Sequence, residues 1–398
     1  MSKLKALDEN LNLTEKRIIL RVDLNVPIQD KKITDQSRIE KIIPVIKKLI
    51  NKKAKIILIS HLGRPKGKID QKLSLKPIAA ILENLLNAKV HFSDSNLGST
   101  VIEKSKKINA GEVLLLENLR FNNEEELNTK SFAKELSKLG EIYINEAFSC
   151  SHRAHTSVCE ITNYIDSYAG KLLIEEVNAI KMLTNNAKKP VICIIGGSKI
   201  STKIGIISNL VKKIENIAIV GAMANNFIKY KGYNIGKSLF EANTENLLKD
   251  IIKQCEINNC NMILPTDAIV AKDHNSTGEL KNLDEIKDED LILDIGIKTI
   301  ENICKKIENS KTVLWNGPAG YFEIKEFSNG SNEIAKKITE NTKNKSLTSI
   351  AGGGDTVAAI NKFNCSKGFT YISTAGGAFL ELLEGKILPG IKALEINE

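Results

Sequence analysis

Residues 191–211 read VICIIGGSKISTKIGIISNLV, and this stretch decides the fold class. It opens on a continuous apolar run, residues 191–195, which is typical of a strand buried on both faces of a parallel sheet. Two glycines then predict a sharp turn, and the spacing of Ile204, Ile207 and Leu210 predicts a helix. A buried strand followed by a turn and a helix is the repeating unit of parallel α/β sheets.

The same alternation recurs along the whole chain of 398 residues. Apolar runs predict strands of the first half at residues 18–26, 55–60, 113–117 and 141–144. Further runs predict strands of the second half at residues 191–195, 217–220, 261–264, 291–294, 312–315, 347–351 and 370–373. Helical patterns, such as residues 39–50, lie between them. We therefore predict an α/β protein with two doubly wound, Rossmann-like parallel sheets.

The length of the chain indicates two domains, because a single hydrophobic core stops growing at about 250–300 residues. Residues 171–184 are amphipathic, contain neither Gly nor Pro, and predict a helix that connects the two halves. The expected organisation is a first domain at residues 1–170, an interdomain helix at residues 171–184 and a second domain at residues 185–386.

The chain is basic, with 57 Lys and Arg residues against 48 Asp and Glu residues and a formal net charge of +9. Its lysines are spread along the chain without interleaved aromatic residues, whereas a nucleic-acid-binding protein more often concentrates them. Nucleic-acid binding is therefore the weaker alternative. No apolar run reaches the roughly 18 residues of a transmembrane helix, and the first ten residues lack the apolar core of a signal peptide. We expect a cytoplasmic protein that binds neither nucleic acid nor membrane.

Seven cysteines are scattered along the chain, and no Cys-x-x-Cys pair occurs. Cys255 and Cys260 have the spacing that comes nearest to a metal site, but no His lies near them in the sequence. An odd number of cysteines in an intracellular chain is typical of free thiols rather than of a disulfide framework or a zinc site.

The chain contains only six arginines, all within its first 153 residues. Because lysine is used almost everywhere else, these arginines indicate a role for the planar guanidinium, which binds carboxylate or phosphate through two parallel hydrogen bonds. We interpret Arg17 as a surface ion-pair residue. We predict an anion site that contains His61 and four of the remaining arginines. These four are Arg38, Arg64, Arg120 and Arg153.

Polar segments follow the predicted strands, and in open α/β sheets ligands bind at these carboxyl ends. The segments of the first half are cationic and form hydrogen bonds readily: residues 23–25, 61–64, 118–120 and 145–153. The segments of the second half are rich in glycine: residues 196–199, 316–318, 352–355 and 374–377. The first set predicts a site for a compact anion, and the second predicts a site for a nucleotide polyphosphate.

Residues 196–199, GGSK, follow a predicted strand and precede a predicted helix. The glycines would let backbone N–H groups approach a phosphate closely. Lys199 and Lys203 are four residues apart and would share a face of that helix. An ordinary tight turn followed by solvated lysines explains this motif equally well.

Residues 352–356, GGGDT, also follow an apolar run and begin a helical pattern. Three glycines provide a nest of N–H groups that can bind an anion. Asp355 has two interpretations, since Asp is a common N-cap of helices and is also a hard oxygen ligand for Mg²⁺. Gly376 belongs to a third glycine-rich helix start.

Eight motifs, in this order, resemble the phosphoglycerate kinase family along the whole chain. They are RVDLNVP (residues 21–27), SHLGRP (60–65), ENLRF (117–121), HRAH (152–155), GGSK (196–199), WNGP (315–318), GGGDT (352–356) and LLEGK (382–386). Eight motifs in one order are far more specific than any single motif. The resemblance implies a glycolytic enzyme with two α/β domains that face a cleft. It would transfer a phosphoryl group between ATP and the carboxylate of 3-phosphoglycerate, with Mg²⁺.

Carried over by motif, the resemblance implies a site for 3-phosphoglycerate in the N-terminal domain. Its residues would be Asp23, Leu24, Asn25, Arg38, His61, Leu62, Gly63, Arg64, Arg120 and Arg153. The nucleotide would bind in the C-terminal domain, with Asp355 as the Mg²⁺ ligand. Its residues would be Gly196, Gly197, Lys199, Lys203, Asn316, Glu323, Gly353, Gly354, Asp355 and Thr356. The C-terminal tail, residues 387–398, would return to the first domain.

Such a reaction needs no catalytic base, because the acceptor carboxylate is already ionised at neutral pH. We expect Arg38 and Lys199 to stabilise the transferring group, with help from the backbone N–H groups of Gly353 and Gly376.

The chain departs from the commonest sequence of the family at Thr202 and Ala375, where that sequence has Asp and Gly. The resemblance implies a monomer, and the alternative function is that of another kinase acting on a small carboxylate.

Overall fold

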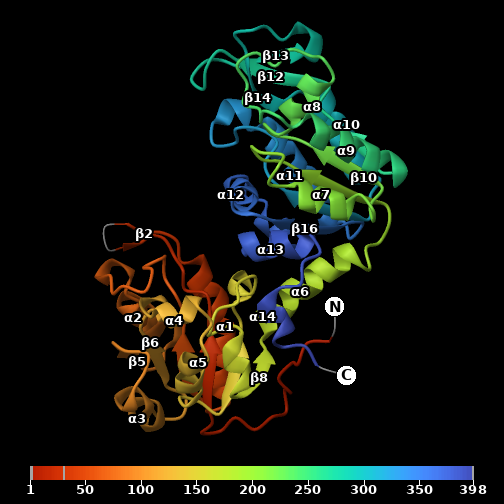
Figure 1. Ribbon diagram of the computed structural model, residues 1–398. Coiled ribbons are helices and arrows are strands. Elements are labelled where there is room, and N and C mark those ends of the chain that lie inside the picture. The colour runs from red at the N-terminus through yellow and green to blue at the C-terminus, as the bar shows by residue number, and fades with distance from the viewer. Residues whose placement is uncertain (1–2, 30–31, 397–398) are drawn as a thin grey trace. The chain divides into compact units, whose positions relative to one another are not determined.

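The computed structural model describes residues 3–29 and 32–396, and the chain divides into two compact units (Figure 1). The first unit comprises the residues up to Val177 together with those from Ile387 onward, and the second comprises Asn178–Lys386. The boundary falls inside helix α6 (Lys171–Thr184). No helix in the described part of the chain has the length and apolarity needed to cross a membrane.

The first unit is built around six parallel strands in the order β5-β6-β4-β1-β7-β8. Their bounds are β1 (Arg17–Arg21), β4 (Lys55–Ile59), β5 (Val90–Ser93), β6 (Val113–Leu116), β7 (Ile142–Asn145) and β8 (Asp166–Ala169). A short hairpin of β2 (Ile28–Gln29) and β3 (Lys32–Ile33) follows β1. The strand order reverses between β1 and β7, and such a reversal leaves a crevice at the carboxyl ends of the two strands.

Helices cover both faces of this sheet. They are α1 (Ser37–Asn51), α2 (Lys76–Leu86), α3 (Ser99–Lys107), α4 (Asn123–Glu126), α5 (Lys130–Ser137) and α14 (Pro389–Lys392) of the tail. Ile18 and Leu20 of β1 share one core with α1 and α2, whereas Ile19 shares another with α3 and α5. Because neighbouring residues of a strand point to opposite faces, a strand covered on both sides is apolar at nearly every position.

The second unit contains six parallel strands in the order β11-β10-β9-β15-β16-β17. Their bounds are β9 (Val191–Ile195), β10 (Asn216–Ile219), β11 (Asn261–Ile263), β15 (Thr312–Asn316), β16 (Thr348–Gly352) and β17 (Tyr371–Ser373). Numbered within the unit, this is the order 3-2-1-4-5-6 of a Rossmann sheet, which reverses between β9 and β15. The predicted fold of two doubly wound parallel sheets is confirmed.

The second unit contains seven α-helices among its described residues. They are α7 (Ile204–Leu210), α8 (Ala224–Tyr230), α9 (Glu245–Ile257), α10 (Ile297–Glu308), α11 (Asn329–Lys343), α12 (Gly354–Lys362) and α13 (Gly376–Leu383). Ile303 of α10 and Ile334 of α11 share a core with Val313 and with the fully buried Trp315 of β15. The central strand β15 is therefore fixed by packing as well as by its two neighbouring strands.

One predicted strand lies in a different sheet. The sequence predicts residues 291–294 as part of the parallel sheet, and this is wrong. They belong to β14 (Leu291–Ile295), which pairs antiparallel with β12 (Asp267–Ala271), and β12 pairs in turn with β13 (Glu279–Asn282). A short apolar run indicates a buried strand but does not reveal the direction of its neighbour, which is why the sequence misses this separate sheet.

The prediction also differs from the structure at three strands of the first sheet, β1, β5 and β8. The expected strand at residues 18–26 ends at Arg21, because side chains replace the sheet as hydrogen-bond partners beyond it. The N–H of Leu24 donates to the Ser60 hydroxyl (2.9 Å), and the N–H of Asn25 donates to Asp23 Oδ1 (2.9 Å). The edge strands β5 and β8 were not predicted, since their sequences, VHFS and DSYA, contain no continuous apolar run.

Asp267 of β12 fixes the start of α10. Its carboxylate accepts the N–H of Lys298 (2.9 Å), the N–H of Thr299 (2.9 Å) and the hydroxyl of Thr299 (2.6 Å), and the residue is 1% exposed. We expect Asp267→Ala to lower the free energy of unfolding by about 1–3 kcal/mol, because these donors lose their acceptor. Urea unfolding measures the change. The control, Asp250→Ala at an exposed position of α9, should change stability by less than about 0.5 kcal/mol. Equal effects of the two substitutions would contradict the role of Asp267.

Candidate functional site

The first half-site lies at the carboxyl end of β1, where the chain leaves the sheet. Arg38 Nη1 donates to Asp23 Oδ2 over 2.6 Å. The Ser149 hydroxyl donates to the same oxygen, and the N–H of Asn25 donates to the other one. Asp23 therefore orients Arg38, which lies in the first turn of α1 and keeps 32% of its side chain exposed.

Hydrogen bonds connect the loops that follow β1, β4 and β6. Asn25 Oδ1 accepts the N–H of Gly63 (2.8 Å), and the carbonyl of Gly63 accepts Arg120 Nη1 (2.8 Å). Gly63 has φ +61°, a left-handed conformation that favours glycine, and a Cβ here would lie 2.7 Å from a leucine methyl group. Leu24 and Leu62 are buried and anchor their loops. The three loops therefore hold one another in place.

His61 is buried and neutral. Its Nδ1 lies 3.1 Å from Arg21 Nη2, and because a guanidinium can only donate, Nδ1 is the acceptor and Nε2 carries the proton. Burial, followed by the charges of Arg21 and Arg120, holds the pKa of His61 well below its ordinary value. At neutral pH this imidazole therefore offers an N–H donor without a positive charge.

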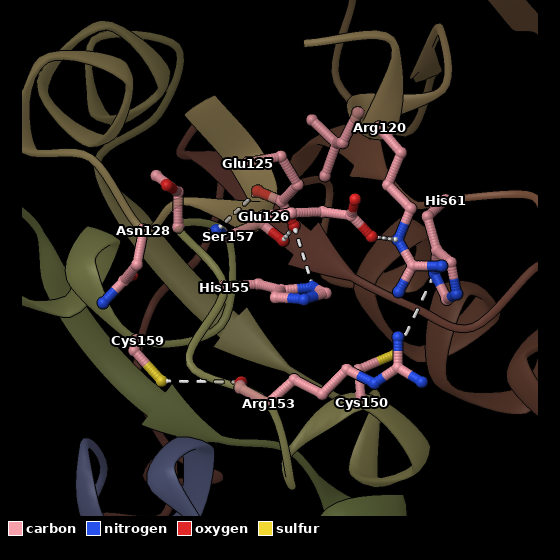
Figure 2. A network of polar contacts seen from close by, with 12 residues as sticks. His61, Arg120, Glu125, Glu126, Asn128, Cys150, Arg153, His155, Ser157 and Cys159 are labelled. Carbon is pink, nitrogen blue, oxygen red and sulfur yellow. Dashed lines mark hydrogen bonds and ion pairs between the residues drawn. The ribbon is translucent and has the colours of Figure 1, made fainter. Parts of the chain in front are cut away.

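The Arg21 guanidinium is fully buried and is held by a chain of hydrogen bonds. Its Nε donates to the Ser157 hydroxyl (2.9 Å), which donates to Glu125 Oε1 (2.6 Å). Figure 2 shows the Glu125 carboxylate in contact with both Ser157 and His155, and His155 Nδ1 is 4.0 Å from Glu125 Oε1. Burial raises the pKa of Glu125, and Arg21 and Ser157 oppose that rise.

Arg120 and Arg153 contribute further positive charge. Arg120 Nε is 3.3 Å from Glu126 Oε1, and Arg153 Nε donates to His152 Nε2 (3.1 Å). Burial, reinforced by the neighbouring arginines, lowers the pKa of His155 to about 3. The positive charge of this half-site therefore resides on guanidinium groups and not on the buried His155.

The structure brings most of the predicted anion-site residues together. Arg38, His61 and Arg120 are connected through the loops described above. Burial lowers the pKa of Arg120, and the nearby charge of Arg153 lowers it further. Arg64 is exposed on the loop that carries His61. In the part of the chain that the structure describes, no hydrogen bond or ion pair involves its side chain.

Three residues of this half-site were not predicted from the sequence. Arg21 ends a strand in a chain with few arginines, and this signal could have identified it. Glu125 of α4 and Ser157 gave no such signal, because they come from distant segments that meet only after folding.

The second half-site lies where the strand order of the second sheet reverses. The N–H of Gly196, after β9, donates to the carbonyl of Asn316 at the end of β15 (2.8 Å). A Cβ on Gly196 would lie 2.3 Å from the carbonyl oxygen of Pro318, and a Cβ on Gly317, which has φ +102°, would lie 2.2 Å from the carbonyl oxygen of Gly196. The two backbones approach so closely that both positions require glycine.

Side chains connect this turn to the start of α12. Lys203 Nζ donates to Asn316 Oδ1, and Asn316 Nδ2 donates to the carbonyl of Gly352 (2.5 Å). The hydroxyl of Thr356 accepts the N–H of Gly317 (2.7 Å). Burial lowers the pKa of Lys203, and the nearby carboxylate of Asp355 opposes this shift. The group is a partly desolvated cation close to a glycine-rich helix start.

One local prediction for this half-site is wrong, and the structure decides against one of the two interpretations of Asp355. Helix α7 begins at Ile204, so Lys203 is its N-cap and Lys199 lies outside it, and the two lysines do not share a helix face. The N-cap of α12 is Gly353, with φ +99°, whereas Asp355 lies exposed in the first turn. The interpretation of Asp355 as an N-cap is therefore excluded.

Two glycine-rich helix starts leave room for a ligand. Gly354 begins α12 and Gly376 begins α13. A Cβ built on either residue would have no heavy atom within 4 Å, apart from atoms of its chain neighbours and of its own helix backbone. Both backbones are therefore open to a neighbouring group.

A pocket of about 580 Å³ adjoins these segments within the second unit. Gly197, Glu323 and Asp355, all predicted for the nucleotide, contribute to its lining. Its walls also include apolar residues of β14 and the His274 and Tyr321 rings, whose centroids are 4.8 Å apart. The volume is ordinary for a small-molecule site. The sequence did not indicate these walls, because they come from the antiparallel sheet and its loops.

Comparisons with known proteins agree on one family. The sequence model of that family, described as phosphoglycerate kinase, matches residues 8–386. The phosphoglycerate kinase of Orientia tsutsugamushi (strain Ikeda) is 47% identical, over 99% of this chain and 98% of the relative. That of Bradyrhizobium diazoefficiens is 44% identical over the full length of both chains.

Solved structures give the same result. The phosphoglycerate kinase of Coxiella burnetii has a TM-score of 0.90 at 39% identity, over 98% of this chain and 99% of that one. The phosphoglycerate kinase of Pyrococcus horikoshii OT3 has a TM-score of 0.81 at 29% identity, over 97% of both chains. Because sequence and fold agree over nearly the whole length, the chain belongs to the phosphoglycerate kinase family.

Proposed function

We propose that the first unit binds 3-phosphoglycerate and the second binds the nucleotide. As a member of its family, the chain is a glycolytic phosphotransferase that transfers a phosphoryl group between ATP and the carboxylate of 3-phosphoglycerate. The observation that carries the assignment is the asymmetry of the two half-sites. The first gathers guanidinium groups around β1, and the second combines open glycine backbones with a pocket of about 580 Å³.

In the proposed substrate site, a phosphate and a carboxylate meet donors that are already fixed. Arg38 is held by Asp23, and His61 presents an uncharged N–H donor. Guanidinium groups suit both anionic ends of the substrate, because each offers parallel N–H donors. We assign to this site the following residues: Asp23, Leu24, Asn25, Arg38, His61, Leu62, Gly63, Arg64, Arg120 and Arg153.

In the proposed nucleotide site, backbone N–H groups and lysines face the phosphates, and the pocket of the second unit takes the base and ribose. Lys203, held by Asn316, and the exposed Lys199 supply the positive charge. We assign to this site the following residues: Gly196, Gly197, Lys199, Lys203, Asn316, Glu323, Gly353, Gly354, Asp355 and Thr356.

We assign Mg²⁺ to Asp355. Its carboxylate is exposed, belongs to the first turn of α12 and lines the pocket. Within the described residues, no group of three or more His, Cys, Asp and Glu side chains could hold a metal ion. A single carboxylate suits Mg²⁺, because proteins usually bind this ion through one or two carboxylates together with substrate phosphates and water. When bound, the ion neutralises charge on the phosphates.

The proposed mechanism relies on positioning and charge neutralisation. The acceptor carboxylate is ionised at neutral pH, so no residue has to remove a proton from it. Arg38 and Lys199 would stabilise the charge of the transferring group, and the N–H groups of Gly353 and Gly376 would donate to its oxygens. We further propose a cytoplasmic monomer. All seven cysteines are free thiols, as in a reducing compartment.

The direct test is a coupled assay with 3-phosphoglycerate and MgATP. Acetate and aspartate serve as competing acceptors, since the arginine cluster favours an acceptor that itself carries a phosphate. Turnover with either of them at the rate seen with 3-phosphoglycerate would favour another carboxylate kinase. A titration with DNA at physiological salt tests the nucleic-acid alternative, and diffuse lysines predict weak, salt-sensitive binding.

We expect Arg38→Ala to lower kcat by about 10²–10³-fold, because it removes a positioned donor to the transferring group. Arg38→Lys should recover little of this loss, since an ammonium cannot form two parallel hydrogen bonds. Steady-state kinetics measure both variants. Arg17→Lys is the matched control, because Arg17 pairs with Glu141 at the start of β1. Near-normal turnover of Arg38→Lys would refute the bidentate role.

We expect Asp355→Asn to weaken the use of MgATP while leaving the affinity for 3-phosphoglycerate nearly unchanged. Loss of an outer-shell partner costs about 10–100-fold in metal affinity, so loss of a direct ligand should raise the apparent Mg²⁺ requirement by roughly tenfold or more. Titration of activity with Mg²⁺ at fixed ATP measures this requirement. Unchanged dependence on Mg²⁺ would exclude Asp355 as a ligand.

We also expect the chain to become more compact when both substrates are bound. The residues assigned to the two substrates belong to separate units, and phosphoryl transfer requires reacting atoms within about 3–3.5 Å. Contacts that differ between open and closed states arise only with both ligands present. Solution scattering should show a lower radius of gyration with 3-phosphoglycerate and a non-hydrolysable MgATP analogue than with either alone. A ligand-free chain as compact as the ternary complex would contradict closure.

A further inference from the structure

Helix α9 ends in a hydrogen-bonded turn that brings two cysteines together. After the helix ends at Ile257, Asn259 adopts a left-handed conformation with φ +52°. The N–H of Cys260 donates to the carbonyl of Cys255 (2.9 Å), and the N–H of Asn259 donates to the carbonyl of Glu256 (3.2 Å). These two hydrogen bonds define a Schellman motif, in which the first and last residues place their side chains in contact.

The contact in such a motif is usually between apolar side chains, but here both partners are thiols. The Cys255 and Cys260 thiols are close enough for each to shift the pKa of the other, and the residues are only 3% and 5% exposed. We predicted from the sequence that both are free thiols without a metal partner, and both are free thiols in the structure. What the sequence did not indicate is that the turn joins their side chains.

A pocket of about 550 Å³ reaches both thiols. Its lining includes Cys255 and Cys260 together with Lys231, Glu256 and Asn259. The residues between the two cysteines are partly or fully exposed. Because both thiols line this pocket, a small molecule that enters it reaches them.

The two thiols differ in acidity. The neighbouring Cys260 thiol lowers the pKa of Cys255, against burial and the charge of Glu256. The Cys255 thiol raises the pKa of Cys260, and burial and the neighbouring Cys193 and Glu215 add to that rise. Because Cys193 and Glu215 disfavour a thiolate at Cys260, we take Cys255 as the attacking thiol.

We propose that Cys255 and Cys260 form an oxidisable dithiol that hydrogen peroxide converts into a disulfide across the end of α9. In the first step the Cys255 sulfur attacks one peroxide oxygen, the O–O bond breaks, and the departing hydroxide takes up a proton to give water. Cys255 is then a sulfenic acid. In the second step the Cys260 sulfur attacks the Cys255 sulfur, the S–O bond breaks, and the hydroxide leaves with the Cys260 proton as water. Two thiols lose two electrons, and one peroxide is reduced to two waters.

The disulfide would join Cys255, near the end of α9, to Cys260, which directly precedes β11. Strand β11 is an edge strand of the second sheet. Cys260 precedes β11, so it lies at the amino end of this parallel sheet, whereas the proposed nucleotide residues follow the carboxyl ends. The inference is therefore independent of the proposed function, and we expect the oxidised chain to retain its activity.

The full-length folded chain offers a direct test. It is treated with hydrogen peroxide at neutral pH, the remaining thiols are alkylated, and trypsin is added. Both cysteines fall in one tryptic peptide, residues 254–272, which contains no other cysteine. We expect this peptide to lose both alkylation sites and two hydrogen atoms, and dithiothreitol to restore them. Oxidation of Met262 adds an oxygen and is distinguished by mass. A peptide that stays fully alkylated, or that carries a sulfinic acid without a disulfide, would overturn the proposal.

Single substitutions test the order of the two steps. Cys260→Ser should stop at a sulfenic acid on Cys255, which dimedone traps, whereas Cys255→Ser should leave Cys260 unmodified. The reverse pattern would overturn the assignment of Cys255 as the attacking thiol. Cys365→Ser is the matched control, because Cys365 is a buried thiol of the same unit, and this variant should still form the disulfide. Circular dichroism checks that each variant is folded, and the result with the unmodified chain stands if one is not.

Discussion

The reversal of strand order is the constraint on which both half-sites depend. In each sheet the reversal falls beside the first strand, between β1 and β7 or between β9 and β15. The connections on either side of a reversal diverge, so the carboxyl ends of the two strands are left uncovered by helices. The residue groups described above start at these ends or at the carboxyl ends of other strands of the same sheet. The fold therefore decides where a ligand can bind before any side chain decides which ligand.

The two units use this opening in different ways. In the first, Arg21 ends β1 as a fully buried charge, which Ser157 connects to the buried Glu125. A buried charge without a partner is strongly destabilising, so this connection offsets part of the cost of burying Arg21 beside His61. In the second, Gly196 and Gly317 let two backbones come so close that no side chain fits. One opening is rich in fixed charge, and the other is lined by backbone.

The sequence predicts those parts of the molecule that a single local pattern determines. Continuous apolar runs identified the central strands, and the scarcity of arginine pointed to Arg38, which lies in the first turn of α1. Local patterns failed where the outcome depends on a distant segment. The run at residues 291–294 pairs with β12 rather than with the parallel sheet, and α7 starts too late to hold Lys199. Glu125 could not be found, because only folding brings it to Arg21.

The first half-site holds the N–H donors of its arginines in place, and the protein itself uses only some of them. A guanidinium has five N–H donors. Among the hydrogen bonds of the described residues, Arg38 uses one donor, for Asp23, and Arg120 uses one, for the carbonyl of Gly63. Arg120 Nε is buried and makes no hydrogen bond within the described chain, although Glu126 lies 3.3 Å away. Donors fixed in this way during folding need little rearrangement when an anion arrives, so the cost of orienting them does not weaken binding. The contacts that order these arginines therefore prepare them for the substrate that we propose for this half-site.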